Sequence, residues 1–127
     1  MKTVTNVARM LVRITGALQI ILGLIVWFGV ADILVPIHIL SGIILVISLL
    51  ALAIVAARVG VNRGLVAFAI VWALAVAVFS LAQEQLLPDQ GHWIIQVVHL
   101  LVGLSLIGLG ERLARQIMDA QKPVVAG

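Results

Sequence analysis

The sequence predicts an all-α fold, namely an integral membrane four-helix bundle in up-down-up-down order. Three observations predict it. Hydrophobic residues make up 64% of the 127 residues and charged residues only 10%, which leaves more apolar surface than a soluble protein of this size could bury. Four continuous apolar runs are each long enough to cross a bilayer core of about 30 Å as a helix. The segments between them are short, so consecutive helices should run antiparallel.

The four apolar runs predict helices and not barrel strands, because their residues are continuously apolar and do not alternate. Backbone amides in lipid must also find partners within their own segment. We therefore expect a single domain over residues 1–127 that consists almost wholly of four transmembrane helices. The apolar runs are 12–30, 35–57, 65–87 and 93–110, within helices at about 8–30, 35–59, 64–87 and 92–119.

Turn-forming residues separate the runs. Gly29 ends the first run, and Pro36 suits the first turn of the second helix. Residues 60–64 and 88–91 contain glycine, asparagine, aspartate and proline, which break helices. Residues 2–31 also resemble a secretory signal peptide, with a basic start, an apolar stretch and small residues at the end. We expect this segment to be retained as the first span.

The charges predict the orientation. Positively charged residues flanking a span favour the cytoplasmic side, and in this topology all eight fall at the end that carries the termini. The chain is therefore expected in a cell inner (plasma) membrane, multi-pass, with both its N-terminus and its C-terminus in the cytoplasm. The basic residues are Lys2, Arg9, Arg13, Arg58, Arg63, Arg112, Arg115 and Lys122, and the opposite end carries Asp32, Glu84, Asp89 and His92.

Composition excludes several function classes. The basic residues are scattered between apolar runs and form no stripe, so no nucleic-acid partner is expected. The chain has no cysteine, which excludes disulfides, thiolate metal sites, iron–sulfur clusters and covalent haem attachment. No nucleophile–base pair or carboxylate dyad can be assembled within the spans, so we do not expect an enzyme.

Few polar side chains lie inside the predicted spans, and each is a candidate for function because burying it in lipid is costly. Gln19, His38 and His99 are the most polar of them. Serine and threonine hydroxyls complete the set, at Thr15, Ser41, Ser48 and Ser80.

The two histidines belong to a repeated pattern. His38 and His99 each begin the sequence His-x-Leu-x-Gly, which ends at Gly42 and Gly103. The second and fourth helices run parallel on a diagonal of the bundle, and a rise of 1.5 Å per residue puts the histidines within about 2–6 Å of the same depth. Each glycine lies one turn deeper on the histidine's face, where a missing side chain leaves room. We therefore predict that the two imidazoles face each other.

This arrangement resembles the haem-binding core of b-type membrane cytochromes, in which histidines on two helices of a four-helix bundle face a macrocycle beside glycines. The resemblance implies one noncovalent haem b, with His38 and His99 as its axial metal ligands, in electron transfer. It also implies haem packing against Gly42, Gly103 and the first helix. That helix presents Gly16, Gln19 and Gly23 on one stripe, for which close helix packing is the alternative explanation.

The chain departs from the b-type cytochrome pattern in two respects. Quinol-oxidising members carry two ligands on each helix, whereas each helix here offers one well-placed histidine, so one haem is expected. Haem propionates usually meet arginine or lysine, and here the basic residues lie at the far end. Backbone amides, Trp93, Gln96 or His92 would have to replace them. His92 is otherwise expected to be a solvated residue at a loop end.

Alternative functions remain open. The chain could be a non-catalytic membrane subunit or scaffold whose histidines serve packing, or a small lipid- or quinone-binding four-helix protein. The expected partners are the lipid bilayer, a redox partner or quinone, and a second copy of the chain in a homo-oligomer.

Overall fold

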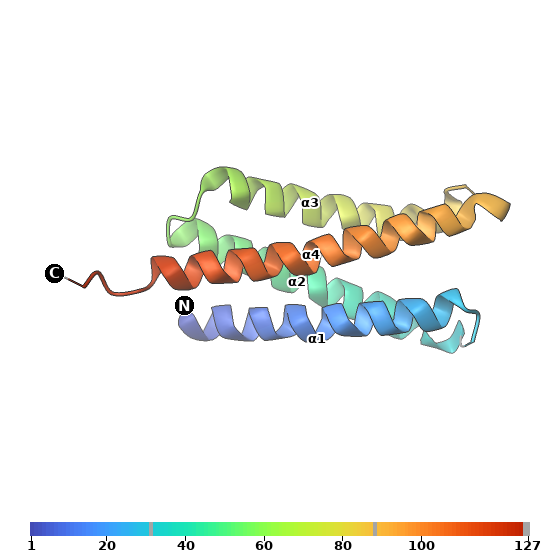
Figure 1. The fold of residues 1–127 in the computed structure, drawn as a ribbon, viewed down its shortest axis with the longest axis horizontal. Coiled ribbons are helices and arrows are strands. Elements are labelled where there is room, and N and C mark those ends of the chain that lie inside the picture. Colours follow the sequence, from blue (N-terminus) through green and yellow to red (C-terminus); the bar gives the residue numbers. More distant parts are fainter. Residues whose placement is uncertain (31, 88, 126–127) are drawn as a thin grey trace.

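The computed structural model describes residues 1–30, 32–87 and 89–125, and within these ranges it contains four long α-helices (Figure 1). Each of them is long and apolar enough to cross a membrane. The helices are α1 (Lys2–Trp27), α2 (Val35–Arg58), α3 (Arg63–Ala82) and α4 (His92–Ala120). Short 3₁₀ turns lie at Asp32–Leu34, Gln83–Gln85 and Asp89–Gly91.

The start of α1 and the end of α3 differ most from the expected helix boundaries, and α1 also ends at Trp27, three residues before the expected residue 30. The first helix begins at Lys2, earlier than residue 8, because its first turns pack against the end of α4 and bury Thr5, whose hydroxyl donates to the carbonyl of Met1. The third helix ends at Ala82, earlier than residue 87. Leu87 has a φ of +44°, and a residue that precedes proline is disfavoured in helical conformation.

Local chemistry explains the turn between α2 and α3. Gly60 has a φ of +81°, a conformation that glycine adopts without steric cost. The side chain of Asn62 then accepts hydrogen bonds from the backbone amides of Gly64 (2.8 Å) and Leu65 (3.2 Å). These bonds satisfy two of the free amides at the start of α3.

Helices α2 and α4 form the short diagonal of the bundle. In the described part of the chain α2 contacts each of the other three helices, whereas α1 and α3 do not contact each other. Figure 1 shows α1 and α3 at opposite edges, with α2 and α4 between them and both ends of the chain at one end of the bundle. The second and fourth helices therefore meet across the centre.

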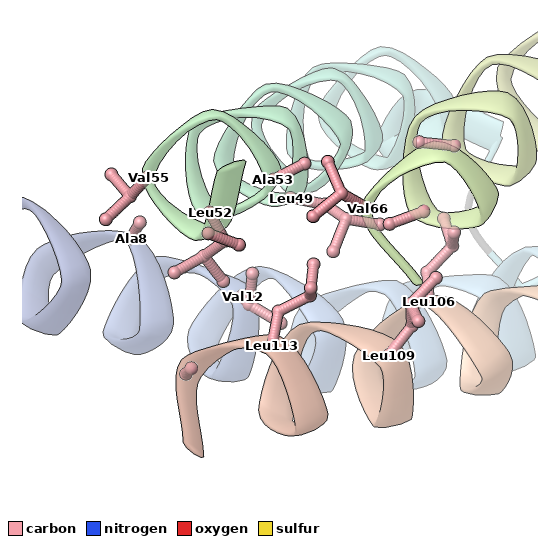
Figure 2. Packing of buried hydrophobic residues seen from close by; sticks show 14 of the residues in the cluster. Ala8, Val12, Leu49, Leu52, Ala53, Val55, Val66, Leu106, Leu109 and Leu113 are labelled. Atoms are coloured by element: carbon pink, nitrogen blue, oxygen red, sulfur yellow. The ribbon is translucent and has the colours of Figure 1, made fainter. Parts of the chain in front are cut away.

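The tightly packed core occupies the half of the bundle near the termini (Figure 2). Leu49 and Leu52 of α2 meet Val12 of α1 and Leu113 of α4 there, all fully buried. In the opposite half, residues 77–87 and 92–105 include no buried residue. Toward that end the α1–α2 pair and the α3–α4 pair diverge in Figure 1, so α3 and α4 are loosely packed in the half that carries the histidines, whereas α1 and α2 remain in close contact there.

Large apolar side chains also cover the outer surface of every long helix. Ile21, Ile47, Val71 and Leu101, one from each helix, are all more than half exposed. A soluble monomer rarely exposes so extensive an apolar surface. The four apolar helices and this surface are consistent with a multi-pass membrane protein.

Candidate functional site

His38 and His99 are neighbours in the folded chain. Their ring centres lie 5.9 Å apart and the ring planes are inclined by 55°. His38 lies in the first turns of α2, and His99 lies two turns into α4. Because α2 and α4 are parallel and form the short diagonal, residues at equal depth on their inner faces meet. The structure thus brings together the two residues that the repeated sequence pattern singled out.

His38 is held from the side of α1. The Nδ1 atom of His38 is buried and, among the described residues, has no hydrogen-bond partner. A Cβ atom built on Gly23 would lie 3.3 Å from Cε1 of His38, so the glycine lets the imidazole lie against the backbone of α1. A buried ring nitrogen without a partner costs free energy, and it marks a place where a ligand or a metal would compensate.

The backbone beside His38 is fixed by Gln19. The Nε2 atom of Gln19 donates to the carbonyl oxygen of His38 and to the hydroxyl of Ser41, the latter at 2.8 Å. Ser41 in turn donates to the same carbonyl at 3.0 Å. Both amide hydrogens of Gln19 are therefore used in joining α1 to α2, and these bonds fix the backbone of α2 at His38.

His99 is held from the side of α3. Its ring stacks on Phe79 with ring centres 6.1 Å apart and 28° between the planes. The Oγ atom of Ser80 lies 3.5 Å from Nδ1 of His99, and it donates its own hydrogen to the carbonyl of Val76. We infer from this use of the hydroxyl hydrogen that Ser80 can only accept from Nδ1, weakly at this distance. This tautomer leaves the lone pair on Nε2 of His99.

The four predicted glycine positions have different surroundings. Gly23 supports His38, and a Cβ on Gly103 would meet nothing within 4 Å. A Cβ on Gly16 would lie 2.6 Å from Ile107, and one on Gly42 would lie 2.8 Å from Nε2 of Gln19. Gly16 and Gly42 are therefore close-packing positions in this structure, Gly23 is covered by the ring of His38, and Gly103 is the one of the four that borders open space.

The remaining polar residues of the spans serve their own helices. Thr15 and Ser48 donate to backbone carbonyls four residues earlier. His92, the first residue of α4, has its Nδ1 3.4 Å from the carbonyl of Leu86, so its nearest polar neighbour belongs to the adjoining turn. The described residues contain no group of three or more His, Cys, Asp or Glu suited to a metal ion. A haem iron needs only two protein ligands, because the porphyrin supplies the others, so the proposed histidine pair does not depend on such a group.

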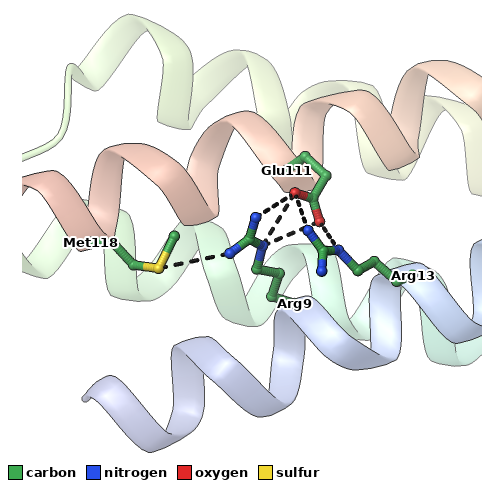
Figure 3. Close-up of polar contacts among 4 residues, drawn as sticks. All are labelled: Arg9, Arg13, Glu111 and Met118. Carbon is green, nitrogen blue, oxygen red and sulfur yellow. Dashed lines mark hydrogen bonds and ion pairs between the residues drawn. The ribbon is translucent and has the colours of Figure 1, made fainter.

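An ion-pair cluster between α1 and α4 was not predicted (Figure 3). Arg9 and Arg13 both bind the carboxylate of Glu111, with shortest nitrogen–oxygen distances of 2.8 and 2.6 Å. The two arginines are four residues apart, hence on one face of α1, and Glu111 comes directly after the apolar run 93–110. That spacing was a usable signal, but the basic residues were interpreted only as markers of orientation.

No protein-family model matches this chain, and comparisons with curated proteins and with solved structures likewise find no match.

Proposed function

We propose that this chain is a b-type membrane cytochrome that binds one noncovalent haem b through His38 and His99 and carries electrons. In this proposal it crosses the inner (plasma) membrane four times with both termini in the cytoplasm. The observation that carries the proposal is the 5.9 Å separation of the two imidazole centres, one from each diagonal helix.

The separation of the rings suits two axial ligands. A metal–imidazole bond is about 2 Å long, so two imidazoles on opposite faces of one iron have their bonding nitrogens about 4 Å and their centres about 6 Å apart. Histidines that served only to pack two helices together would not need any particular distance between their ring centres. The observed 5.9 Å supports an axial pair.

The surroundings of the pair also fit a flat macrocycle. On the side of α3 and α4, residues 77–87 and 92–105 include no buried residue, and a Cβ on Gly103 would meet nothing within 4 Å. In this proposal each imidazole would give one ring nitrogen to the iron: Nδ1 of His38 has no hydrogen-bond partner among the described residues, and Nδ1 of His99 has the hydroxyl of Ser80 3.5 Å away. Apolar helices around the pair would exclude water and keep both imidazoles neutral, as metal binding requires.

When bound, the haem would supply a reversible one-electron change at its iron. The residues of this chain hold and orient it: Gln19 and Ser41 fix the backbone below one ligand, and Phe79 and Ser80 fix the ring of the other. The proposed role is that of a carrier that exchanges electrons with a redox partner or a quinone.

A non-catalytic subunit or a quinone-binding bundle is the second candidate, and one observation favours it. Both amide hydrogens of Gln19 are used in joining α1 to α2, which is what a purely packed bundle would also need. This candidate predicts a protein that binds no haem, and in which both histidines affect only stability.

Haem titration of purified variants separates the two candidates. We expect wild-type protein to take up one haem with a sharp Soret band, and His38→Ala and His99→Ala each to lose most of that band, because removing either imidazole removes an axial bond. His92→Ala is the matched control, since His92 lies at the helix start beside Leu86, and it should bind haem like wild type. Equal uptake by His38→Ala, His99→Ala and wild type would eliminate the proposed ligands.

A further inference from the structure

A hollow lies between α3 and α4, away from the histidines. Its volume is about 370 Å³, and it opens on the outer surface of the bundle. α3 contributes two aromatic residues, and α4 contributes the rest. The lining residues are Phe68, Trp72, Ser105, Gly108, Leu109 and Arg112.

The walls of this hollow have their polar groups satisfied. The indole Nε1 of Trp72 donates to Oγ of Ser105 at 2.7 Å, and Ser105 donates to the carbonyl of Val102. Phe68 stacks on Trp72 with an angle of 11° between the rings. A Cβ on Gly108 would meet nothing within 4 Å. The hollow is thus an apolar trough whose floor is kept open by a glycine.

One end of the trough carries a cation. Arg112 has no carboxylate partner among the ion pairs of the described residues, because the carboxylate of neighbouring Glu111 is taken by Arg9 and Arg13, and Asp119 pairs with Lys122. Glu111 and Asp119 are the two acidic residues at this end of the bundle, against eight basic ones. The guanidinium of Arg112 is therefore available to an anion, and its planar donors match phosphate oxygens.

We propose that this trough binds one phospholipid with an anionic headgroup. Its phosphate would pair with Arg112, and an acyl chain would lie along Phe68, Trp72 and Gly108. From Arg112 to Ser105 the trough extends over seven residues of α4, or about 10 Å, toward the apolar middle of the bundle. A free phosphate ion would use the arginine and leave the apolar walls empty, whereas a lipid uses both. The site is independent of the histidine pair.

Native mass spectrometry of the purified full chain tests this site, with phosphatidylglycerol or phosphatidylcholine added. Wild type should retain one phosphatidylglycerol in preference to phosphatidylcholine. Gly108→Leu should lose the retained lipid, because leucine fills the trough without meeting other atoms. Arg112→Gln should lower the preference for phosphatidylglycerol about fivefold, the effect of one cation near a membrane surface. Arg58→Gln removes a positive charge from α2 at the same end of the bundle but outside the trough, and it should behave like wild type.

Two results would overturn the lipid site. The first is retention of phosphatidylglycerol by Gly108→Leu at the wild-type level. The second is an equal loss of preference in Arg112→Gln and Arg58→Gln, which would mean that the basic end attracts anionic lipid diffusely. If Gly108→Leu does not fold, the comparison of the two arginine variants decides alone.

Discussion

Individual glycines in this bundle determine how closely two neighbouring helices can approach each other. Gly110 of α4 is buried, and a Cβ there would lie 2.8 Å from Cγ1 of Val12, which is itself fully buried. Valine has few alternative rotamers in a helix, so it cannot move aside easily. Gly108, two residues earlier, is exposed, and a Cβ there would meet nothing within 4 Å. Gly110 therefore allows a close contact between α1 and α4, whereas Gly108 makes no such contact.

This difference predicts opposite outcomes for two identical substitutions. Gly110→Ala should destabilise the fold by about 1–3 kcal/mol, because the added methyl group overpacks the contact between α1 and α4. Gly108→Ala should change stability by less than about 0.5 kcal/mol. Unfolding in increasing sodium dodecyl sulfate, followed by circular dichroism, measures both. If the two variants unfold together, the close approach of α1 and α4 at Gly110 is wrong.

At the scale of helices, the ion-pair cluster joins the first helix to the last. Arg9, Arg13 and Glu111 are the residues that connect α1 and α4 through charge, and the side chain of Glu111 is only 18% exposed (Figure 3). One carboxylate that holds two guanidinium groups stabilises more than an isolated surface pair does. The pair between Lys122 and Asp119 is the contrasting case, with both side chains mostly exposed.

Removing the shared carboxylate should therefore have a measurable cost. Glu111→Gln is expected to destabilise the fold by about 1 kcal/mol, since it leaves two arginines facing each other without their anion. Asp119→Asn, the control, should have almost no effect because its pair is exposed to solvent. The same detergent unfolding assay compares them. An equal effect of the two substitutions would show that the cluster adds nothing beyond a surface pair.

The four helices and the closeness of the two histidines could be predicted from the sequence. The side chains that each helix presents to its neighbours could not. Apolar length and turn residues predicted the long helices of the described chain, and equal depth predicted the closeness of His38 and His99. The rotation of each helix about its axis decides which neighbour a glycine meets. Nothing in the spacing of Gly16 and Gly42 indicated Ile107 and Gln19 as their partners, because that rotation depends on side-chain packing across the whole bundle.

On the scale of the whole molecule, charge and packing are both distributed unevenly between the two ends. The end with the termini has all eight lysines and arginines and the packed core. The other end has Asp32, Glu84 and Asp89, the histidines and the loose packing. The first asymmetry supports a cytoplasmic location for the termini, and the second supports a cofactor held in the opposite half.

The orientation can be measured directly with reporters at the C-terminus. Green fluorescent protein fused there should fluoresce and alkaline phosphatase should be inactive, because the proposed orientation puts the basic end of the bundle in the cytoplasm. The same two reporters inserted after Gln90 should give the reverse pattern. An active C-terminal phosphatase would contradict the proposed orientation, although not the helical fold.

The central claim is that His38 and His99 hold one haem between them, and an absorbance spectrum of the purified wild-type protein tests it most directly. We expect a Soret band equivalent to one haem per chain, with sharp α and β bands after dithionite reduction, as two axial imidazoles produce. A wild-type protein that is folded, supplied with haem and still colourless would contradict it.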